Sequence, residues 1–159
     1  MSKVVSGRQT AELEGGVVVF VIGMRLNQPW KVWEWWPVFM AMPRMLKELY
    51  EHPELGFLST EYFISFANRA PVLVQYWKSF EHLEAYARSK SHAHLPAWGE
   101  FNRRLAKTGS VGIFHETYVV GPGKSETLYA NMPPFGLARA AGQVPATGRR
   151  ETARERLTG

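Results

Sequence analysis

Two histidines, His94 and His115, lie where the sequence pattern predicts a change of structure, and both are candidates for chemistry. Imidazole titrates near neutral pH, so it can act as a general acid or base and can also bind metal. His94 falls at a break between two helical segments, beside Pro96, where its ring can point into a cavity. His115 lies in the middle of a predicted strand, a position where a packed, hydrogen-bonded histidine is the commoner interpretation.

His94 is a candidate axial ligand of haem iron. Haem needs one imidazole nitrogen and an apolar, aromatic slot, and the neighbouring Trp98 and Phe101 could provide its walls. His92, two residues earlier, is the rival ligand. A metal site made of His92, His94 and a carboxylate is a further alternative, for which no third ligand is evident.

Four predicted strands position these residues. The β-branched run 17–26 predicts a strand that is buried on both faces, with Arg25 near its end on one of them. Residues 55–66 and 72–78 predict two strands of a hairpin, joined by a turn at 67–71. Residues 110–120 predict the strand that carries His115.

Helices are expected between the strands. Apolar residues spaced by three and four predict a helix over 30–50, with a kink or two shorter pieces because Pro37 and Pro43 lie inside it. Ser79 is a plausible N-cap for a second helix. That helix loosens at 89–93, and a further helical piece runs from about Leu95 to Lys107.

The order strand, helix, strand, strand, helix, strand predicts an α+β fold of the ferredoxin-like type, βαββαβ. One sheet face is left without a cover, so we expect a homodimer in which two sheets face each other as a dimeric α+β barrel. We divide the chain into a flexible lead-in (1–14), a single domain with a C-terminal arm (15–137) and a basic disordered tail (138–159).

Composition restricts the function classes. The chain has 159 residues, no cysteine and a net charge of +5, of which the segment after Leu137 supplies +3. The rest is nearly balanced, which argues against nucleic acid as a partner. No apolar run is long enough to span a membrane, and we expect a cytoplasmic protein with a small-molecule substrate. Four tryptophans between positions 30 and 36 predict packing against the sheet or a subunit, or contact with a flat ligand or a membrane surface.

Three segments resemble the C-terminal half of the haem-containing aldoxime dehydratases, the phenylacetaldoxime dehydratase family. They are QYWKSFEHLEAYARSKSHAHL, VGIFHETYVV and ETLYANMPPFGLA. The family's proximal His-Leu pair corresponds to His94-Leu95, and its distal Tyr-His-Glu corresponds to Phe114-His115-Glu116. Its substrate-contacting arginine, followed five residues later by tryptophan, corresponds to Arg25. The family's catalytic serine has no clean counterpart, and Ser59 is the nearest serine.

The resemblance implies a haem-dependent lyase that removes water from an aldoxime to give a nitrile. It implies haem b held by His94, with His115 as the general acid and base and Arg25 holding the hydroxyl of the substrate.

Two other function classes stay open. One is a monooxygenase-like enzyme on the same barrel, in which His94, Trp77 and Asn102 position a small aromatic substrate. The other is a non-catalytic dimer that binds haem or a small apolar ligand.

Overall fold

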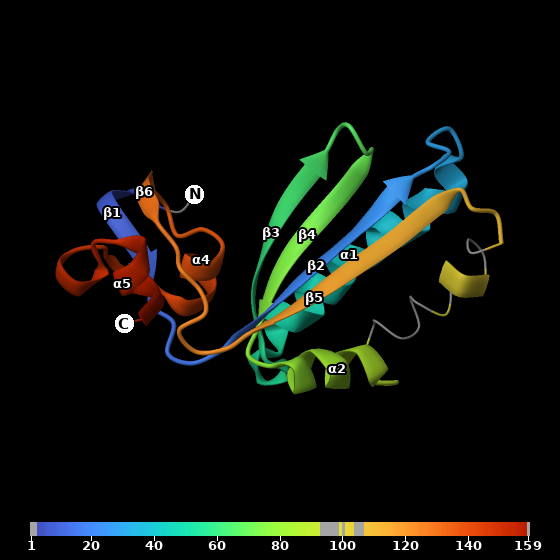
Figure 1. The fold of residues 1–159 in the computed structure, drawn as a ribbon. Helices are drawn as coiled ribbons and strands as arrows, with labels where there is room; N and C mark the ends of the chain where they lie inside the picture. Colours follow the sequence, from blue (N-terminus) through green and yellow to red (C-terminus); the bar gives the residue numbers. More distant parts are fainter. Residues whose placement is uncertain (1–2, 93–98, 100, 104–106, 159) are drawn as a thin grey trace.

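The protein has a four-stranded antiparallel sheet with its long helix on one face (Figure 1). The computed structural model describes residues 3–92, 99, 101–103 and 107–158. The elements of this part follow in the order β2 (Val17–Leu26), α1 (Val32–Glu51), β3 (Phe57–Ser65), β4 (Ala70–Trp77), α2 (Phe80–Arg88) and β5 (Val111–Val120). The strands lie in the order β3-β4-β2-β5. This arrangement confirms the predicted ferredoxin-like α+β fold.

The register of the sheet decides which side chains share a face. β2 lies between β4 and β5, with Ile22 opposite Leu73 on one side and His115 on the other. Because directly opposed residues of an antiparallel pair point to the same face, all three lie on one side of the sheet. The alternate positions, among them Val21, Val74 and Glu116, lie on the other side, which we call the open face.

The hydrophobic core lies on the helix side. Its buried cluster joins the sheet to α1 and α2 and consists of Val18, Leu46, Leu49, Phe57, Leu73, Trp77, Leu83 and Tyr86. A smaller cluster at the other end of the sheet contains Met24 and Val111, with Trp35 and Phe101 packed against it. Alternation in the strands and the spacing of three and four in α1 bring these residues together.

The sequence predicted a kink or two shorter helices at Pro37 and Pro43, and α1 is one continuous helix over Val32–Glu51, which excludes the two shorter helices. Each proline removes one backbone hydrogen bond, and both ring systems are exposed, so neither disturbs the core. Burial of Met45, Leu46 and Leu49 holds the helix on the sheet and offsets those losses.

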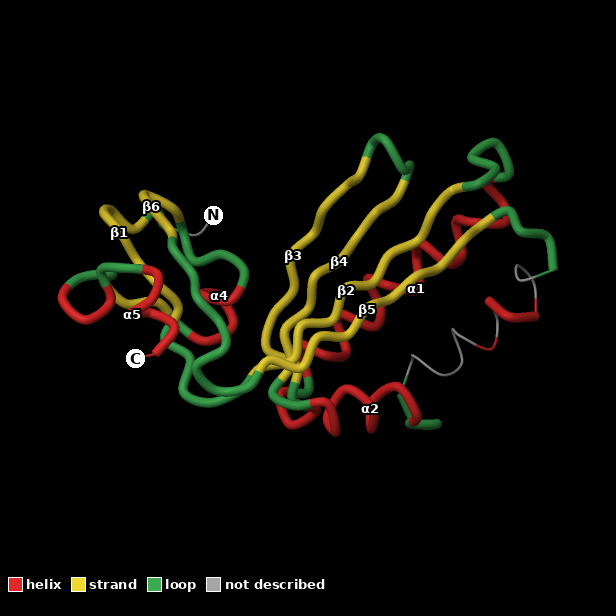
Figure 2. The backbone as a smooth tube through the Cα atoms, viewed as in Figure 1, coloured by secondary structure: helices red, strands yellow, loops and turns green. Residues whose placement is uncertain are grey.

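A second, smaller sheet is formed by the two ends of the chain (Figure 2). β1 (Val5–Ala11) lies between β6 (Tyr129–Met132) and β7 (Gln143–Pro145), and both pairings are antiparallel. Three short helical segments complete this unit: α4 (Leu137–Ala141), the 3₁₀ turn Gly148–Arg150 and α5 (Ala153–Thr158). A 3₁₀ turn, Pro53–Leu55, also connects α1 to β3.

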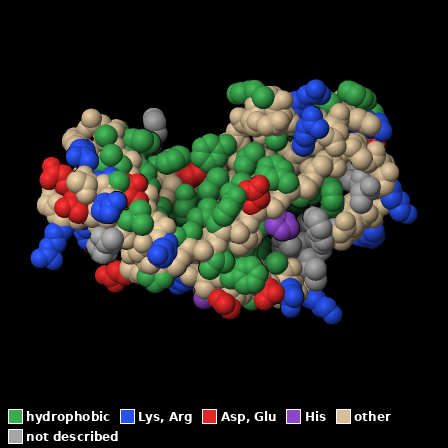
Figure 3. Space-filling view, viewed as in Figure 1, with side chains coloured by type: hydrophobic (Ala, Val, Ile, Leu, Met, Phe, Trp, Pro, Cys, Tyr) green, Lys and Arg blue, Asp and Glu red, His purple; other side chains and the backbone are tan. Residues whose placement is uncertain are grey.

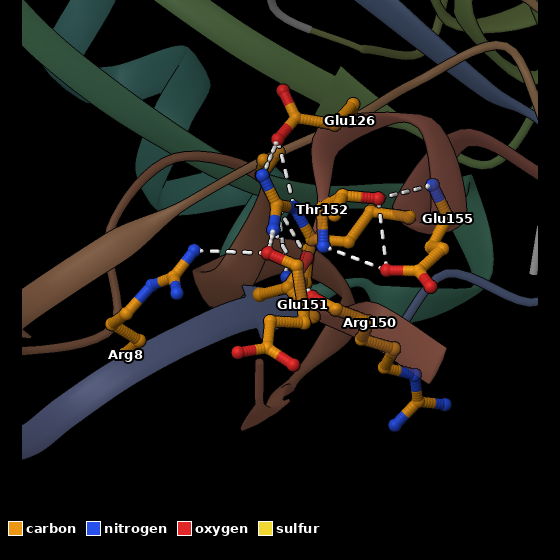
Figure 4. A network of polar contacts seen from close by, with 10 residues as sticks. Arg8, Glu126, Arg150, Glu151, Thr152 and Glu155 are labelled. Carbon is orange, nitrogen blue, oxygen red and sulfur yellow. Dashed lines mark hydrogen bonds and ion pairs between the residues drawn. The ribbon is translucent and has the colours of Figure 1, made fainter. Parts of the chain in front are cut away.

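The ends of the chain therefore differ from the flexible lead-in (1–14) and disordered tail (138–159) expected from composition. Ion pairs and caps hold the tail (Figure 4). The buried guanidinium of Arg156 binds the carboxylate of Glu126 and donates to the backbone oxygens of Arg150 and Glu151 at 3.0 and 2.8 Å. Thr152 and Glu155 cap α5 reciprocally, each accepting from the other's backbone N–H. At least one arginine of the segment that was predicted to be disordered, Arg156, therefore makes contacts that hold the folded tail in place.

The C-terminal arm also covers part of the open face, which the sequence predicted no segment of this chain could do. Glu61 of β3 is buried there and accepts a 2.7 Å hydrogen bond from the backbone N–H of Gly136. The ring of Phe135 lies edge-on to Phe63, with centroids 6.2 Å apart. These contacts fix the small sheet unit to the β3 edge.

Candidate functional site

His115 lies on the helix side of the sheet, at the margin of the core. β5 places it opposite Ile22, and its ring lies 5.6 Å from the ring of Phe20 at an interplanar angle of 39°. Phe20 and Ile22 pack against the main core cluster, yet His115 itself is exposed. The result is an accessible imidazole beside an apolar wall, which suits proton transfer to a small apolar molecule.

Arg25 does not share this position. Its register partner on β5 is Gly112, so it lies on the open face with Gly23 and Glu116. It is exposed, whereas the sequence predicted a buried face, and its Nη1 donates to Asn27 Oδ1 at 3.1 Å. Within the described chain the sheet therefore separates the two residues that were predicted to act on one substrate.

The predicted cofactor-binding residues are only partly described. His94 and Trp98 lie outside the described residues. Phe101 is half-buried and packs against the smaller core cluster of Met24 and Val111. This packing shows that Phe101 contributes to the core, and its role beside a cofactor stays a prediction.

Two residues of the monooxygenase alternative have different environments. Trp77 is buried in the core and donates from Nε1 to Gln75 Oε1 at 3.0 Å, so its role in the described structure is to pack and not to contact a ligand. Asn102 is exposed. Ser59, the serine nearest in sequence to the position of the dehydratase serine, is buried on the open face opposite Tyr76, away from the face of His115.

A polar cluster of Glu48, Tyr86 and His92 was not found from the sequence. His92 Nδ1 lies 3.0 Å from Glu48 Oε1, and the Tyr86 hydroxyl donates to Glu48 Oε2 at 2.9 Å. Burial and then the Glu48 carboxylate raise the pKa of Tyr86. The Glu48 carboxylate lies within hydrogen-bonding distance of the His92 ring and fixes the orientation of that ring. The cluster also ties the segment after α2 to α1.

No local motif announces this cluster, because Glu48 and His92 are 44 residues apart in the chain. Among the described residues, no group of three or more His, Cys, Asp or Glu side chains is arranged to hold a metal ion.

A hollow of about 330 Å³ lies in the small sheet unit and contains none of the predicted site residues. Its lining is polar and includes Thr10, Glu12, Ser125, Thr127 and Arg150. Arg150 and Glu12 form an ion pair across it at 3.7 Å, and Thr127 Oγ1 accepts from the backbone N–H of Ala11 at 2.8 Å. These contacts show that the hollow lies where the N-terminal and C-terminal segments of the chain meet.

The strand order and the helices define a ferredoxin-like α+β protein, and the exposed imidazole of His115 is its candidate functional group. Residues 17–137 match the model of the family described as Monooxygenase af470-like. This range is well over half of the chain, and the chain belongs to that family.

One relative and two solved structures show how far the likeness extends. Monooxygenase af470 of Aspergillus fumigatus is 28% identical over 175 residues, which cover 98% of this chain and 61% of the relative. The chain thus spans less than two thirds of that protein. An aldoxime dehydratase in complex with butyraldoxime has a TM-score of 0.70 at 18% identity, covering 89% of this chain and 42% of that one. SnoaB of Streptomyces nogalater, a cofactor-independent oxygenase, has a TM-score of 0.45 at 12% identity, covering 64% of this chain and 90% of SnoaB.

The structural likeness to the dehydratase extends to the fold, in keeping with the resemblance seen in the sequence. The family that is shown is the monooxygenase-like one. These comparisons do not show that the chain is a dehydratase, so that assignment stays a prediction.

Proposed function

We propose that this chain acts as a monooxygenase-like enzyme on a small, mainly apolar aromatic substrate, bound on the helix side of the sheet with His115 as the proton-transfer group. The observation that carries this proposal is the exposed His115 imidazole beside Phe20 and Ile22, in a chain of the Monooxygenase af470-like family. Apolar walls with one convergent polar group are typical of small-molecule sites.

The chemistry that fits one imidazole is oxidation of an activated methylene group. In such a reaction R₂CH₂ and O₂ give R₂C=O and H₂O, so the substrate supplies all four electrons and no separate reductant is consumed. His115 would remove the acidic C–H proton as a general base, and it would return that proton to the oxygen atom that leaves as water. The apolar side chains of Phe20 and Ile22 would hold the aromatic rings.

The test is oxygen uptake with anthrone, whose methylene lies between two aromatic rings. We expect His115→Ala to lower kcat/KM by about 100-fold or more, the range typical for loss of a general base. His52→Ala is the matched control, because His52 is exposed in a turn and contacts Glu54. Oxygen uptake by His115→Ala at the wild-type rate would refute the role of His115.

The second candidate is the haem-dependent lyase. It is supported by the motifs around His94 and His115 and by the accessible position of His115. His94 would hold haem b, with Trp98 and Phe101 beside it, and the bound iron would supply the electron density that breaks the N–O bond. His115 would give a proton to the departing hydroxyl and would then take the carbon-bound proton as a base, so that RCH=NOH yields RCN and H₂O and the imidazole returns to its starting state. Arg25 fits this scheme poorly within one chain, because it lies on the open face.

Hemin titration separates the two candidates. Haem binding through His94 predicts a Soret shift that is lost in His94→Ala and kept in His52→Ala. Conversion of phenylacetaldoxime under reducing conditions then tests the lyase itself. An unshifted Soret band with wild-type protein would contradict the haem scheme and leave the oxygenase proposal standing.

We also propose that the open face pairs with a second copy of the chain. Val19, Val21 and Val74 are only half-buried there, and Tyr118 is exposed and donates a short 2.5 Å hydrogen bond to Glu116 Oε2. Figure 3 shows hydrophobic side chains gathered over this face. Two facing sheets would bury them and form the barrel. A monomeric mass in sedimentation velocity at micromolar concentration would contradict this pairing.

A further inference from the structure

One end of the large sheet carries several aromatic side chains that are largely exposed. We call this end the aromatic tip and define it by residues 25–36, 66–69 and 107–110. The side chain of Phe66 is 87% exposed, that of Trp33 is 70% exposed and that of Trp30 is 67% exposed. Trp36 is half-exposed on the same helix. Most large apolar side chains avoid such exposure unless a partner covers them.

The three segments of the aromatic tip are held together by backbone hydrogen bonds. Leu26 donates to the carbonyl of Arg69 at 3.1 Å, which joins the end of β2 to the β3–β4 turn. Asn27 donates from its backbone to the carbonyl of Ser110 at 3.0 Å and from its side chain to that of Gly109 at 3.0 Å. Trp35 Nε1 donates to the carbonyl of Pro29 at 2.9 Å. The exposed rings therefore project from segments whose backbones are fixed to one another by hydrogen bonds.

The aromatic tip is also basic. Its three segments contain four cationic side chains, Arg25, Lys31, Arg69 and Lys107, and one carboxylate, Glu34, a net charge of +3. Glu34 is engaged within the tip, because it lies 3.5 Å from Lys31 Nζ and accepts from the Thr108 hydroxyl at 3.1 Å. In Figure 3 hydrophobic and Lys/Arg side chains gather together at the upper right, over the ends of these strands.

Tryptophan and phenylalanine surrounded by Lys and Arg match the chemistry of an anionic membrane surface. Tryptophan rings settle at the level of the lipid headgroups, and cations near them are attracted to acidic lipids. We propose that the aromatic tip docks the protein on an anionic lipid bilayer, with Trp30, Trp33 and Phe66 entering the interface. No helix in the described part of the chain is long and apolar enough to cross a bilayer, so this contact is peripheral.

Charge argues for a bilayer over a second copy of the chain. An isologous contact of this tip with itself would bring two surfaces of charge +3 together, which is unfavourable. The aromatic rings also project from separate segments, on a helix and a turn, whereas a nucleic-acid strand is bound by successive aromatic side chains along a continuous groove. Lipid recognition needs neither a groove nor a defined register.

The experiment is co-sedimentation of the full chain with two kinds of vesicle, phosphatidylcholine alone and phosphatidylcholine with 30% phosphatidylserine. We expect binding to the anionic vesicles, weakening with salt, and little binding to the neutral ones. Each cation contributes about fivefold near an anionic surface, so the charge reversal Arg69→Glu should lower partitioning by about 25-fold. Phe66→Ser should lower it by about tenfold, since it removes one inserted ring.

Matched controls keep the test decisive. Phe80→Ser changes an exposed phenylalanine at the opposite end of the sheet and should leave partitioning unchanged. Circular dichroism and thermal melting check that every variant is folded. Trp33→Phe keeps an aromatic ring and should retain most of the binding.

Four outcomes would overturn the proposal. They are failure to bind either vesicle, equal loss of binding in Phe80→Ser, displacement from vesicles by single-stranded oligonucleotide at physiological salt, and self-association in solution that Phe66→Ser abolishes. The oxygenase assay is independent of all four, so failure here does not bear on the proposed reaction.

Discussion

Substitution of Glu61 tests whether the small sheet unit is fixed to the large sheet by one buried carboxylate. Glu61 is buried and accepts from the backbone N–H of Gly136 at 2.7 Å, and its Oε1 also lies 3.3 Å from Arg139 Nε. In Glu61→Ala the Gly136 N–H loses its partner at a buried position. We expect the free energy of unfolding to fall by about 3 kcal/mol, the sum of a lost charge-assisted hydrogen bond and an unsatisfied donor.

The two contacts of Glu61 can be separated with matched variants. Arg139 is exposed, so Arg139→Ala should lower the free energy of unfolding by less than about 1 kcal/mol. Glu61→Gln keeps an oxygen that can accept from Gly136 and should fall between the two. The assay is urea unfolding followed by circular dichroism, with limited proteolysis after residue 132 as a local readout. Equal losses in Glu61→Ala and Arg139→Ala would refute the buried hydrogen bond as the dominant contact.

Two further predictions concern pH and packing. Burial and Glu48 raise the pKa of Tyr86 above its unfolded value of about 10, so above pH 10 the unfolded chain releases a proton that the folded protein retains. Above pH 10 the free energy of unfolding should therefore fall more steeply with pH in the wild type than in Tyr86→Phe, by about 1 kcal/mol for each pH unit. Urea unfolding at pH 9, 10 and 11 measures this difference. An equal pH dependence in the two proteins would contradict the raised pKa of Tyr86. Gly56 has a φ of +81°, and an added Cβ would lie 2.4 Å from the His82 ring, whereas Gly15 has a φ of +104° and open space around it. Gly56→Ala should lower the melting temperature clearly more than Gly15→Ala, because both add backbone strain and only the first adds a clash; equal shifts would show that His82 moves aside.

The large sheet could be predicted from the sequence because its signals are local. The β-branched run Val17–Leu26 became β2 with the same bounds, and Ser79 caps α2 by accepting from the backbone N–H of His82. β1 carries no such signal, since its run of Gly, Arg, Gln and Thr is polar. It becomes a strand only by pairing with segments more than a hundred residues away. The cap of Thr152 on Glu155 did have a local signature, the Thr-x-x-Glu pattern, and it was masked by the arginine-rich composition.

The site was predictable only residue by residue. Alternation correctly placed His115 with Ile113 and Thr117, and Arg25 with Gly23. The register between β2 and β5 was not available from either strand alone, and a shift of one residue moves a side chain to the other face. The actual register separates Arg25 from His115. Contact between Glu48 and His92 depends on how α1 and the segment after α2 approach each other, which no local pattern encodes.

The pairing of β1 between β6 and β7 has a consequence for the order of folding during synthesis. The backbone N–H of Gly7 donates to the side-chain oxygen of Asn131, which is synthesised 124 residues later. At typical elongation rates this delay is about 6–25 s, whereas β2 to β5 are complete earlier. The segment spends that time without a partner, and its polar side chains keep it soluble and slow to aggregate while the rest of the chain emerges.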